Sequence, residues 1–193
     1  MRTLALLPVL LALVACSGSE IVGLHIALQP DGSASITARA LTESPTPSPA
    51  EVTSKGALWG KRAALVHSQG TVQKLADLRF GDDSLVIKPH LDANKVTVRI
   101  ERGATVGWVT ALVPDKQTRR DLALVYDPLG KTKEIGDTLR IELVLPATVN
   151  GSSVLPTARG VEAGREGNRA FLSIPVETAR EKGDALSWDI TWQ

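Results

Sequence analysis

The sequence predicts an α+β domain in which a predominantly antiparallel β meander packs against one main helix. Apolar and polar residues alternate over many short runs, and this two-residue period is typical of half-buried strands. Turn-forming residues separate the runs at intervals of about 8–12 residues, as in antiparallel sheets. One longer segment instead carries apolar residues at helical spacing. These three patterns together favour a twisted sheet covered by a helix.

The first two strands are predicted to form a β-hairpin. Apolar residues occupy every second position of residues 22–28 and again of residues 34–40. Between the two runs, Pro30, Asp31 and Gly32 supply a preset φ, a turn-capping carboxylate and a residue tolerant of positive φ. The pattern therefore predicts a tight connection between antiparallel neighbours.

The main helix is predicted to begin near Ser48 and to end near Gly70. Ser48, Pro49 and Glu51 fit a capping box with proline at the first helical position. Two glycines, Gly56 and Gly60, lower the helical propensity of this segment. The predicted apolar face consists of Leu58, Trp59, Ala63, Leu65 and Val66.

Further strands are predicted along the rest of the chain. Asp82 and Asp83 are interpreted as turn formers between two of them, rather than as calcium ligands. Residues 146–167, rich in Gly, Pro, Ser and Asn, are predicted to be irregular, and residues 177–183 to form one helical turn. The predicted strands cover residues 74–80, 84–91, 95–102, 105–113, 121–126, 138–145, 170–176 and 186–192.

The composition indicates a single globular domain over residues 21–193. Hydrophobic residues make up 43% and charged residues 22% of the 193 residues, which is close to the globular average. The formal net charge is only +1, with both signs interspersed. We therefore expect neither nucleic acid nor acidic lipid to be recognised through charge.

The first 15 residues have the features of a bacterial signal peptide. A positive n-region precedes Leu4–Ala15, an apolar run that is too short to span a bilayer, which needs roughly 20 residues. The run ends in Leu13-Val14-Ala15-Cys16, which resembles the lipobox of bacterial lipoproteins. We expect residues 1–15 to be cleaved and residues 16–20 to form a lipidated tether.

The lipobox resemblance implies that Cys16 carries the membrane anchor. A diacylglycerol group would modify its thiol, and a further acyl chain such as palmitate its amino group. Two chains or more give durable anchoring. Cys16 is the single cysteine, so no disulfide can form. Ser17 follows it, which favours the periplasmic face of the outer membrane in two-membrane bacteria; otherwise we expect the outer face of the cytoplasmic membrane.

No catalytic or metal-binding motif emerges from the sequence. His25, His67 and His90 lie in separate segments without the paired spacing of zinc ligands. There is no nucleophile elbow, and Gly130-Lys131-Thr132 lacks the leading glycine of a phosphate-binding loop. We expect no enzymatic activity, no metal and no cofactor. A hydrolase assembled in space would need one of these histidines beside Ser or Asp.

The candidate ligand-binding residues are Trp188, Ile190 and Trp192, which alternate along the last predicted strand. Three roles compete for the tryptophans: packing in the core, stacking on a sugar, or lining a cavity for an apolar ligand. Core packing is the commonest of these roles. A concave sheet covered by a helix is nevertheless a shape that can hold a lipid-sized ligand.

The order of these features resembles the LppM-type envelope lipoprotein domain. The carrying elements are the lipobox, the hairpin with Pro30-Asp31-Gly32, and Leu143–Pro146 leading into the Asn150-Gly151-Ser152 turn before a Trp-bearing strand. The resemblance implies a membrane-tethered, non-enzymatic domain of the cell envelope that binds a lipid, a glycolipid or another apolar ligand. The alternative is a structural lipoprotein that docks a protein partner in an envelope complex.

Overall fold

The computed structural model describes residues 20–42, 52–59, 63–80, 82–113, 117 and 137–193 of the chain. Side chains are described throughout these ranges except at residues 20, 39–42, 52–59 and 63–68. The described segments form two β-sheets with short helices between some strands.

Residues 20–113 contribute six strands, two single-turn 3₁₀ helices and a short α-helix. These are β1 Glu20–Leu28, β2 Ala34–Thr42, β3 Val52–Trp59, β4 Ala63–Val72, η1 Leu75–Asp77, β5 Leu85–His90, η2 Leu91–Ala93, β6 Lys95–Arg102 and α1 Gly107–Leu112. Residues 137–193 contribute five strands and one helix. These are β7 Thr138–Val144, β8 Val149–Leu155, β9 Glu162–Glu166, β10 Arg169–Pro175, α3 Val176–Arg180 and β11 Gly183–Trp192.

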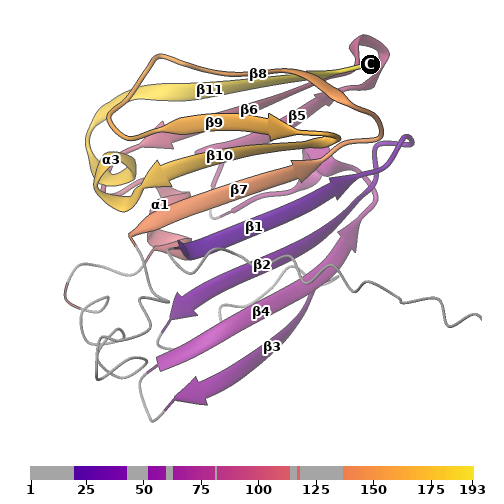
Figure 1. Ribbon diagram of the computed structural model, residues 1–193. Helices are drawn as coiled ribbons and strands as arrows, with labels where there is room; N and C mark the ends of the chain where they lie inside the picture. The colour runs from indigo at the N-terminus through magenta and orange to yellow at the C-terminus, as the bar shows by residue number, and fades with distance from the viewer. Residues whose placement is uncertain (1–19, 43–51, 60–62, 81, 114–116, 118–136) are drawn as a thin grey trace, which may run out of the picture.

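The larger sheet has seven strands in the order β3-β4-β2-β1-β7-β10-β9, and the smaller has four in the order β5-β6-β11-β8 (Figure 1). The smaller sheet lies behind the β1, β7, β10 and β9 part of the larger one. One cluster of buried apolar side chains from both sheets forms the core. Alternate residues of β10 and β11 face this core, as the two-residue period predicts.

The predicted hairpin is confirmed by the pairing of β1 with β2, in which Ile26 lies opposite Ile36. In its turn Gly32 has φ of +86°, and the Asp31 carboxylate accepts a 2.9 Å hydrogen bond from the Ser33 amide. On its other side β1 pairs in parallel with β7. This contact joins segments more than a hundred residues apart, which no local sequence pattern specifies.

The predicted fold class is wrong, because the described residues form two β-sheets with only short helices, and none of these is a main helix covering a meander. The segment expected to be helical forms β3 and β4, which pair with each other, and β4 also pairs with β2. Gly56 and Gly60 each cost a helix about 1 kcal/mol relative to alanine. The capping-box residues of this prediction, 48–51, lie outside the described residues. Instead, the backbone hydrogen bonds between β4 and β2 stabilise the extended conformation of this segment.

Three further predicted segments also differ from the structure. Residues 74–80 contain η1 rather than a strand, and residues 105–113 contain α1, because a short apolar run does not distinguish a strand from a buried helix. Residues 146–167, expected to be irregular, contain β8 and β9, both at the edges of their sheets. The strand predicted at 121–126 lies outside the described residues, whereas the helical turn near 177 is confirmed as α3.

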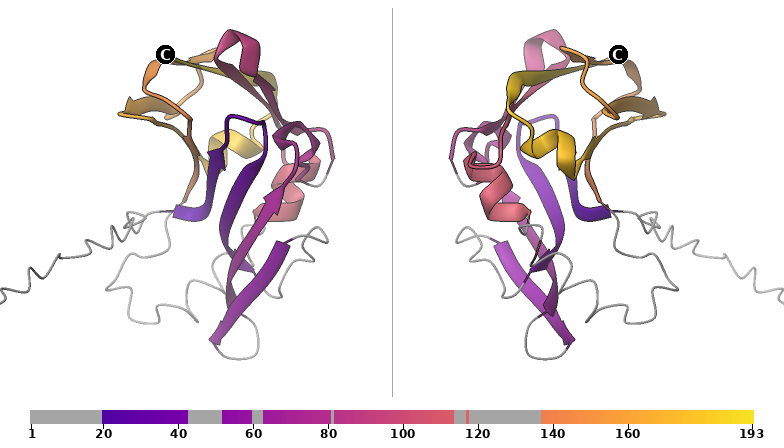
Figure 2. Two further views of the ribbon diagram at one scale, coloured as in Figure 1. Left: turned by 90° about the vertical axis from the view of Figure 1, so that its right-hand side faces the viewer. Right: turned by 90° about the vertical axis from the view of Figure 1, so that its left-hand side faces the viewer.

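The helices α1 and α3 lie at the same end of the two sheets, facing the viewer in the right-hand view of Figure 2. Helix α3 joins β10 of the larger sheet to β11 of the smaller one. The amide of Gly103, between β6 and α1, donates a 2.9 Å hydrogen bond to the carbonyl of Ala179 in α3. This end of the sandwich is therefore closed by helices.

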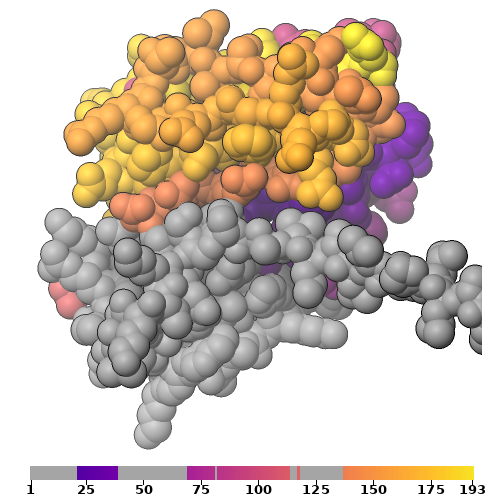
Figure 3. All heavy atoms as spheres, in the orientation of Figure 1, coloured from indigo at the N-terminus to yellow at the C-terminus, as the bar shows by residue number. Residues whose placement is uncertain are grey.

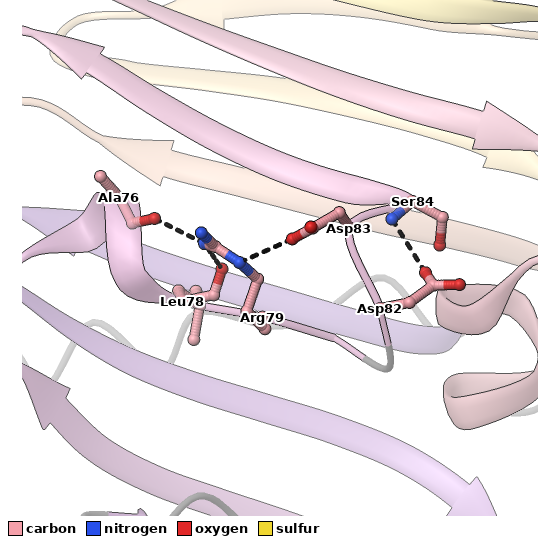
Figure 4. Close-up of polar contacts among 6 residues, drawn as sticks. All are labelled: Ala76, Leu78, Arg79, Asp82, Asp83 and Ser84. Atoms are coloured by element: carbon pink, nitrogen blue, oxygen red, sulfur yellow. Dashed lines mark hydrogen bonds and ion pairs between the residues drawn. The ribbon is translucent and has the colours of Figure 1, made fainter.

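Side chains from another segment cap helix α1. The buried Ser84 hydroxyl accepts a 3.0 Å hydrogen bond from the Trp108 amide. The Ser84 amide in turn donates a 2.8 Å hydrogen bond to the Asp82 carboxylate (Figure 4). The Asp83 carboxylate forms a 2.9 Å ion pair with the Arg79 guanidinium. These contacts fit the prediction that the two aspartates shape a turn. The hydrogen bonds from the Ser84 side chain and backbone hold the pKa of Asp82 below its usual value.

Candidate functional site

The outer face of the smaller sheet is polar near one end of its strands. The strand register aligns Thr191 of β11 with Lys95 of β6 on one side and with Gly151 of β8 on the other. In the next row of outward-facing side chains, Asp189 lies beside Thr97 and Ser153. Charged and hydroxyl side chains from three strands are thereby brought together.

A groove of about 500 Å³ lies at this position, and we call it the β8 groove. Its lining combines hydrogen-bond donors and acceptors from β6, β8, β9 and β11. The lining residues are Lys95, Asn150, Gly151, Ser152, Ser153, Arg165, Asp189 and Thr191. Ligand sites in proteins commonly have volumes of about 300–1,000 Å³.

Asp189 is held in place inside the β8 groove. Its carboxylate accepts a 2.8 Å hydrogen bond from the Thr97 hydroxyl and forms a 3.0 Å ion pair with the Lys95 ammonium. Partial burial raises the pKa of Asp189, but the hydrogen bonds from Thr97 and Lys95 and the charge of Lys95 outweigh it and lower the pKa overall. The site thus presents a fixed carboxylate at neutral pH.

Gly151 leaves room in the wall of the groove. A Cβ atom at this position would lie 2.6 Å from the Thr191 hydroxyl oxygen, closer than real Cβ atoms approach other atoms. The Thr191 hydroxyl donates a hydrogen bond to the side-chain oxygen of Asn150. From the larger sheet, the Arg165 guanidinium donates a 2.9 Å hydrogen bond to the Val149 carbonyl, which positions Arg165 beside β8.

The candidate ligand-binding residues Trp188, Ile190 and Trp192 all face the core. Trp188 and Ile190 are 0% exposed and Trp192 is 6% exposed, so these indoles present no face on which a sugar could stack from solvent. Their position is that of core side chains, and a ligand role for them stays a prediction. Trp188 does contact one lining residue of the β8 groove, because its indole N–H donates a 3.0 Å hydrogen bond to the Ser152 hydroxyl.

An apolar pocket between the sheets, beside Trp108, is nearly filled. It measures about 10 Å³ and is lined mainly by apolar residues of β1, β7 and α1. A volume of this size is no larger than one water molecule needs. At this position the core has no room for an acyl chain.

The three histidines lie apart from one another. The His25 imidazole is 3.4 Å from the Glu142 carboxylate, and His90 is exposed at the end of β5. His67 is in β4, where its backbone pairs with that of Arg39. Across the described part of the chain, no group of three or more His, Cys, Asp or Glu side chains is arranged to hold a metal ion.

A second polar cluster lies on the outer face of the larger sheet. The mostly buried Glu142 carboxylate lies 3.5 Å from Arg169 and 3.9 Å from Arg140, and its buried Oε1 has no hydrogen-bond partner. The Arg140 guanidinium stacks 4.6 Å from the Phe171 ring centre, and that ring covers Gly164. Figure 3 shows the part of this face formed by the C-terminal third of the chain. One carboxylate here faces two guanidinium groups.

The predicted lipid anchor lies outside the described residues, since the description begins at residue 20. The signal peptide and the lipidation of Cys16 therefore remain predictions from the sequence. Within the described ranges, no helix has the length and apolar character needed to cross a membrane.

The residues of the β8 groove were not predicted from the sequence. One signal was present, because Ser187, Asp189 and Thr191 occupy the alternate, outward positions of the strand that carries the buried tryptophans. The Asn150-Gly151-Ser152 segment was interpreted only as a turn. Strand β8 and its pairing with β11 create the groove, and neither was predicted.

Comparison with known proteins adds little to this description. No protein-family model matches the chain, and no curated protein matches it. Among solved structures, the chain is similar to the folded domain of the LppM protein of Mycobacterium tuberculosis, determined by NMR. The two share 12% sequence identity over 91% of this chain and 92% of that one, with a TM-score of 0.37. A likeness at this level does not assign a family.

Proposed function

We propose that the protein is a lipid-anchored lipoprotein of the bacterial cell envelope, and that its domain binds a hydroxyl-rich ligand, such as the sugar part of a glycan or glycolipid, in the β8 groove. The anchor is supported by the signal-peptide pattern and the lipobox ending at Cys16. The observation that carries the binding half is the groove of about 500 Å³ with its fixed carboxylate, Asp189.

The chemistry of the groove favours a hydroxyl-rich ligand over an apolar one. Asn150, Ser153 and Thr191 offer amide and hydroxyl groups, and Asp189 offers a carboxylate that accepts hydrogen bonds. Asp189 already neutralises Lys95, so the groove has only a small excess of positive charge. The narrow pocket beside Trp108 gives no comparable support for an acyl chain in the core.

The anchor is tested by expressing the whole chain in a bacterium supplied with labelled palmitate. We expect the label to be incorporated, and intact-mass measurement to show cleavage before Cys16. Cys16→Ser is the control and should incorporate no label. Incorporation into the Cys16→Ser variant, or none into the wild type, would contradict the proposal.

Ligand binding is tested with the purified lipoprotein in detergent against a panel of neutral and acidic oligosaccharides. We expect at least one to bind, with affinity reduced tenfold or more by Asp189→Ala and by Gly151→Val, which fills the groove. Glu166→Ala is the matched control, because Glu166 is exposed on β9 and does not line the groove. Binding that is unchanged in both groove variants would place the ligand elsewhere.

Docking of an envelope protein partner is the second candidate. Strand β8 is the terminal strand of its sheet, and terminal strands can pair with a strand from another protein. Recovery of one stoichiometric partner with the wild type, lost in Gly151→Val, would favour docking over sugar binding. Oligosaccharide binding without such a partner would favour the first candidate.

A further inference from the structure

The two ends of the sandwich carry different elements. Strand β1 begins at Glu20, paired with the start of β7, at the end where α1 and α3 lie (Figures 1 and 2). We call this the α1 end. The opposite end carries the 29–33 turn, the 3₁₀ helix η2 and the C-terminus. The nine residues of β1 separate the two ends by roughly 27 Å.

The proposed anchor is attached close to the α1 end. Only residues 17–19 separate Cys16 from the first residue of β1. Even fully extended, the four residue steps from Cys16 to Glu20 reach no more than about 14 Å. This reach is about half the length of β1, so acyl chains on Cys16 hold the α1 end near the bilayer.

The surface at the α1 end is suited to such contact. Residues 103–113 contain no charged residue, and among them Ala104, Thr105 and Thr110 are exposed. The uncharged residues of α1 can approach lipid headgroups without the cost of desolvating a charge. Charges do flank them, because the exposed Asp82 carboxylate lies beside Gly107, and residues 180–184, from the last residue of α3 onward, carry charges of both signs. The opposite end also exposes charges, Asp31 and Asp92, so the short tether rather than surface charge decides which end lies near the bilayer.

The β8 groove lies toward the opposite end. Lys95 is the first residue of β6, Asn150 the second of β8, and Thr191 the last but one of β11. Strand β6 runs from the groove toward Arg102, five residues before α1 begins. The groove and the α1 end are thus separated by about the length of a strand.

We infer that the anchored domain rests with its α1 end on the bilayer, so that the β8 groove is held about the length of a strand above the anchoring membrane. This inference rests on the proposed lipidation of Cys16. It identifies the ligand source as the aqueous side, such as a cell-wall glycan or a soluble sugar. A headgroup in the anchoring membrane itself would lie out of reach of the groove.

The orientation is tested with the lipidated protein reconstituted in phosphatidylcholine vesicles. Because lipid blocks the Cys16 thiol, one introduced cysteine accepts an environment-sensitive fluorophore. Thr110→Cys places it on α1, and Asp92→Cys places the matched control on η2, both at exposed positions. We expect headgroup-level spin-labelled lipid to quench the label at 110 at least threefold more than the label at 92, and aqueous iodide to show the reverse order.

Equal quenching at the two positions, or stronger lipid quenching at 92, would overturn the orientation. Thr105→Cys and Ala93→Cys form a second exposed pair that should give the same result if either first variant folds poorly. Flotation with the vesicles and the intact mass are measured beforehand. If the protein neither floats with the vesicles nor has the mass of the lipidated form, the anchor itself has failed. If it floats and is lipidated but shows the wrong quenching order, only the orientation has failed.

Discussion

Trp188 and Ser152 connect the core to the β8 groove. The indole N–H of the fully buried Trp188 donates a 3.0 Å hydrogen bond to the hydroxyl of Ser152, which lines the groove. The tryptophan thus fixes one wall of the candidate site from beneath, without being exposed to a ligand.

Replacing Ser152 should therefore destabilise the domain. In Ser152→Ala the buried indole N–H loses its acceptor, which typically costs about 1–3 kcal/mol in the free energy of unfolding. Urea denaturation followed by tryptophan fluorescence measures this. The control is Ser153→Ala, on the exposed side of the same strand, which should change the unfolding free energy by less than about 0.5 kcal/mol. Equal effects of the two variants would refute the role of the Trp188 hydrogen bond.

Asp189 should contribute to stability in a pH-dependent way. Its pKa is lowered in the folded protein, so its contribution is present above the unfolded pKa of about 4 and is lost as the pH falls through the folded pKa. Its side chain is 42% exposed, so solvent screens the ion pair and we expect only about 0.2–1 kcal/mol at pH 7. The difference in unfolding free energy between wild type and Asp189→Asn should shrink below pH 4. A difference that grows on acidification would contradict this assignment.

A side chain at Gly151 should disturb Thr191. Gly151→Ala places its Cβ against the Thr191 hydroxyl, and overpacking of this kind costs about 1–3 kcal/mol. The double variant Gly151→Ala/Thr191→Ala removes the clash. A double-mutant cycle on unfolding free energies should therefore show coupling of at least about 0.5 kcal/mol. Additive single effects would mean that the two side chains do not collide.

Gly107 should be required by the cap of α1. A Cβ there would lie 2.3 Å from the Asp82 carboxyl carbon, so Gly107→Ala must displace the carboxylate that binds the Ser84 amide. We expect a loss of no more than about 1 kcal/mol, because the exposed Asp82 side chain can move aside at the cost of its hydrogen bond with the Ser84 amide, and alanine otherwise favours a helix. In an Asp82→Ala background the same substitution should become neutral or stabilising. Thermal unfolding of the four proteins tests this, and equal losses in both backgrounds would count against the clash.

The sequence by itself determined features that depend on near neighbours. The hairpin of β1 and β2 followed from alternation around Pro30-Asp31-Gly32, and the inward positions of β11 followed from its two-residue period. The predicted anchor at Cys16 likewise rests on contiguous residues. Such patterns can be recognised because each reflects the conformational preferences of a short segment.

Only the tertiary structure decided the features that join distant segments. The segment predicted to be helical became β3 and β4, because β4 pairs with both β3 and β2, and β1 gained β7 as a parallel neighbour. The β8 groove forms where β6, β8, β9 and β11 meet, and Asp189 acquires its role from Thr97 and Lys95 on another strand. Pairing between strands far apart in sequence depends on global packing, which outweighs local propensity.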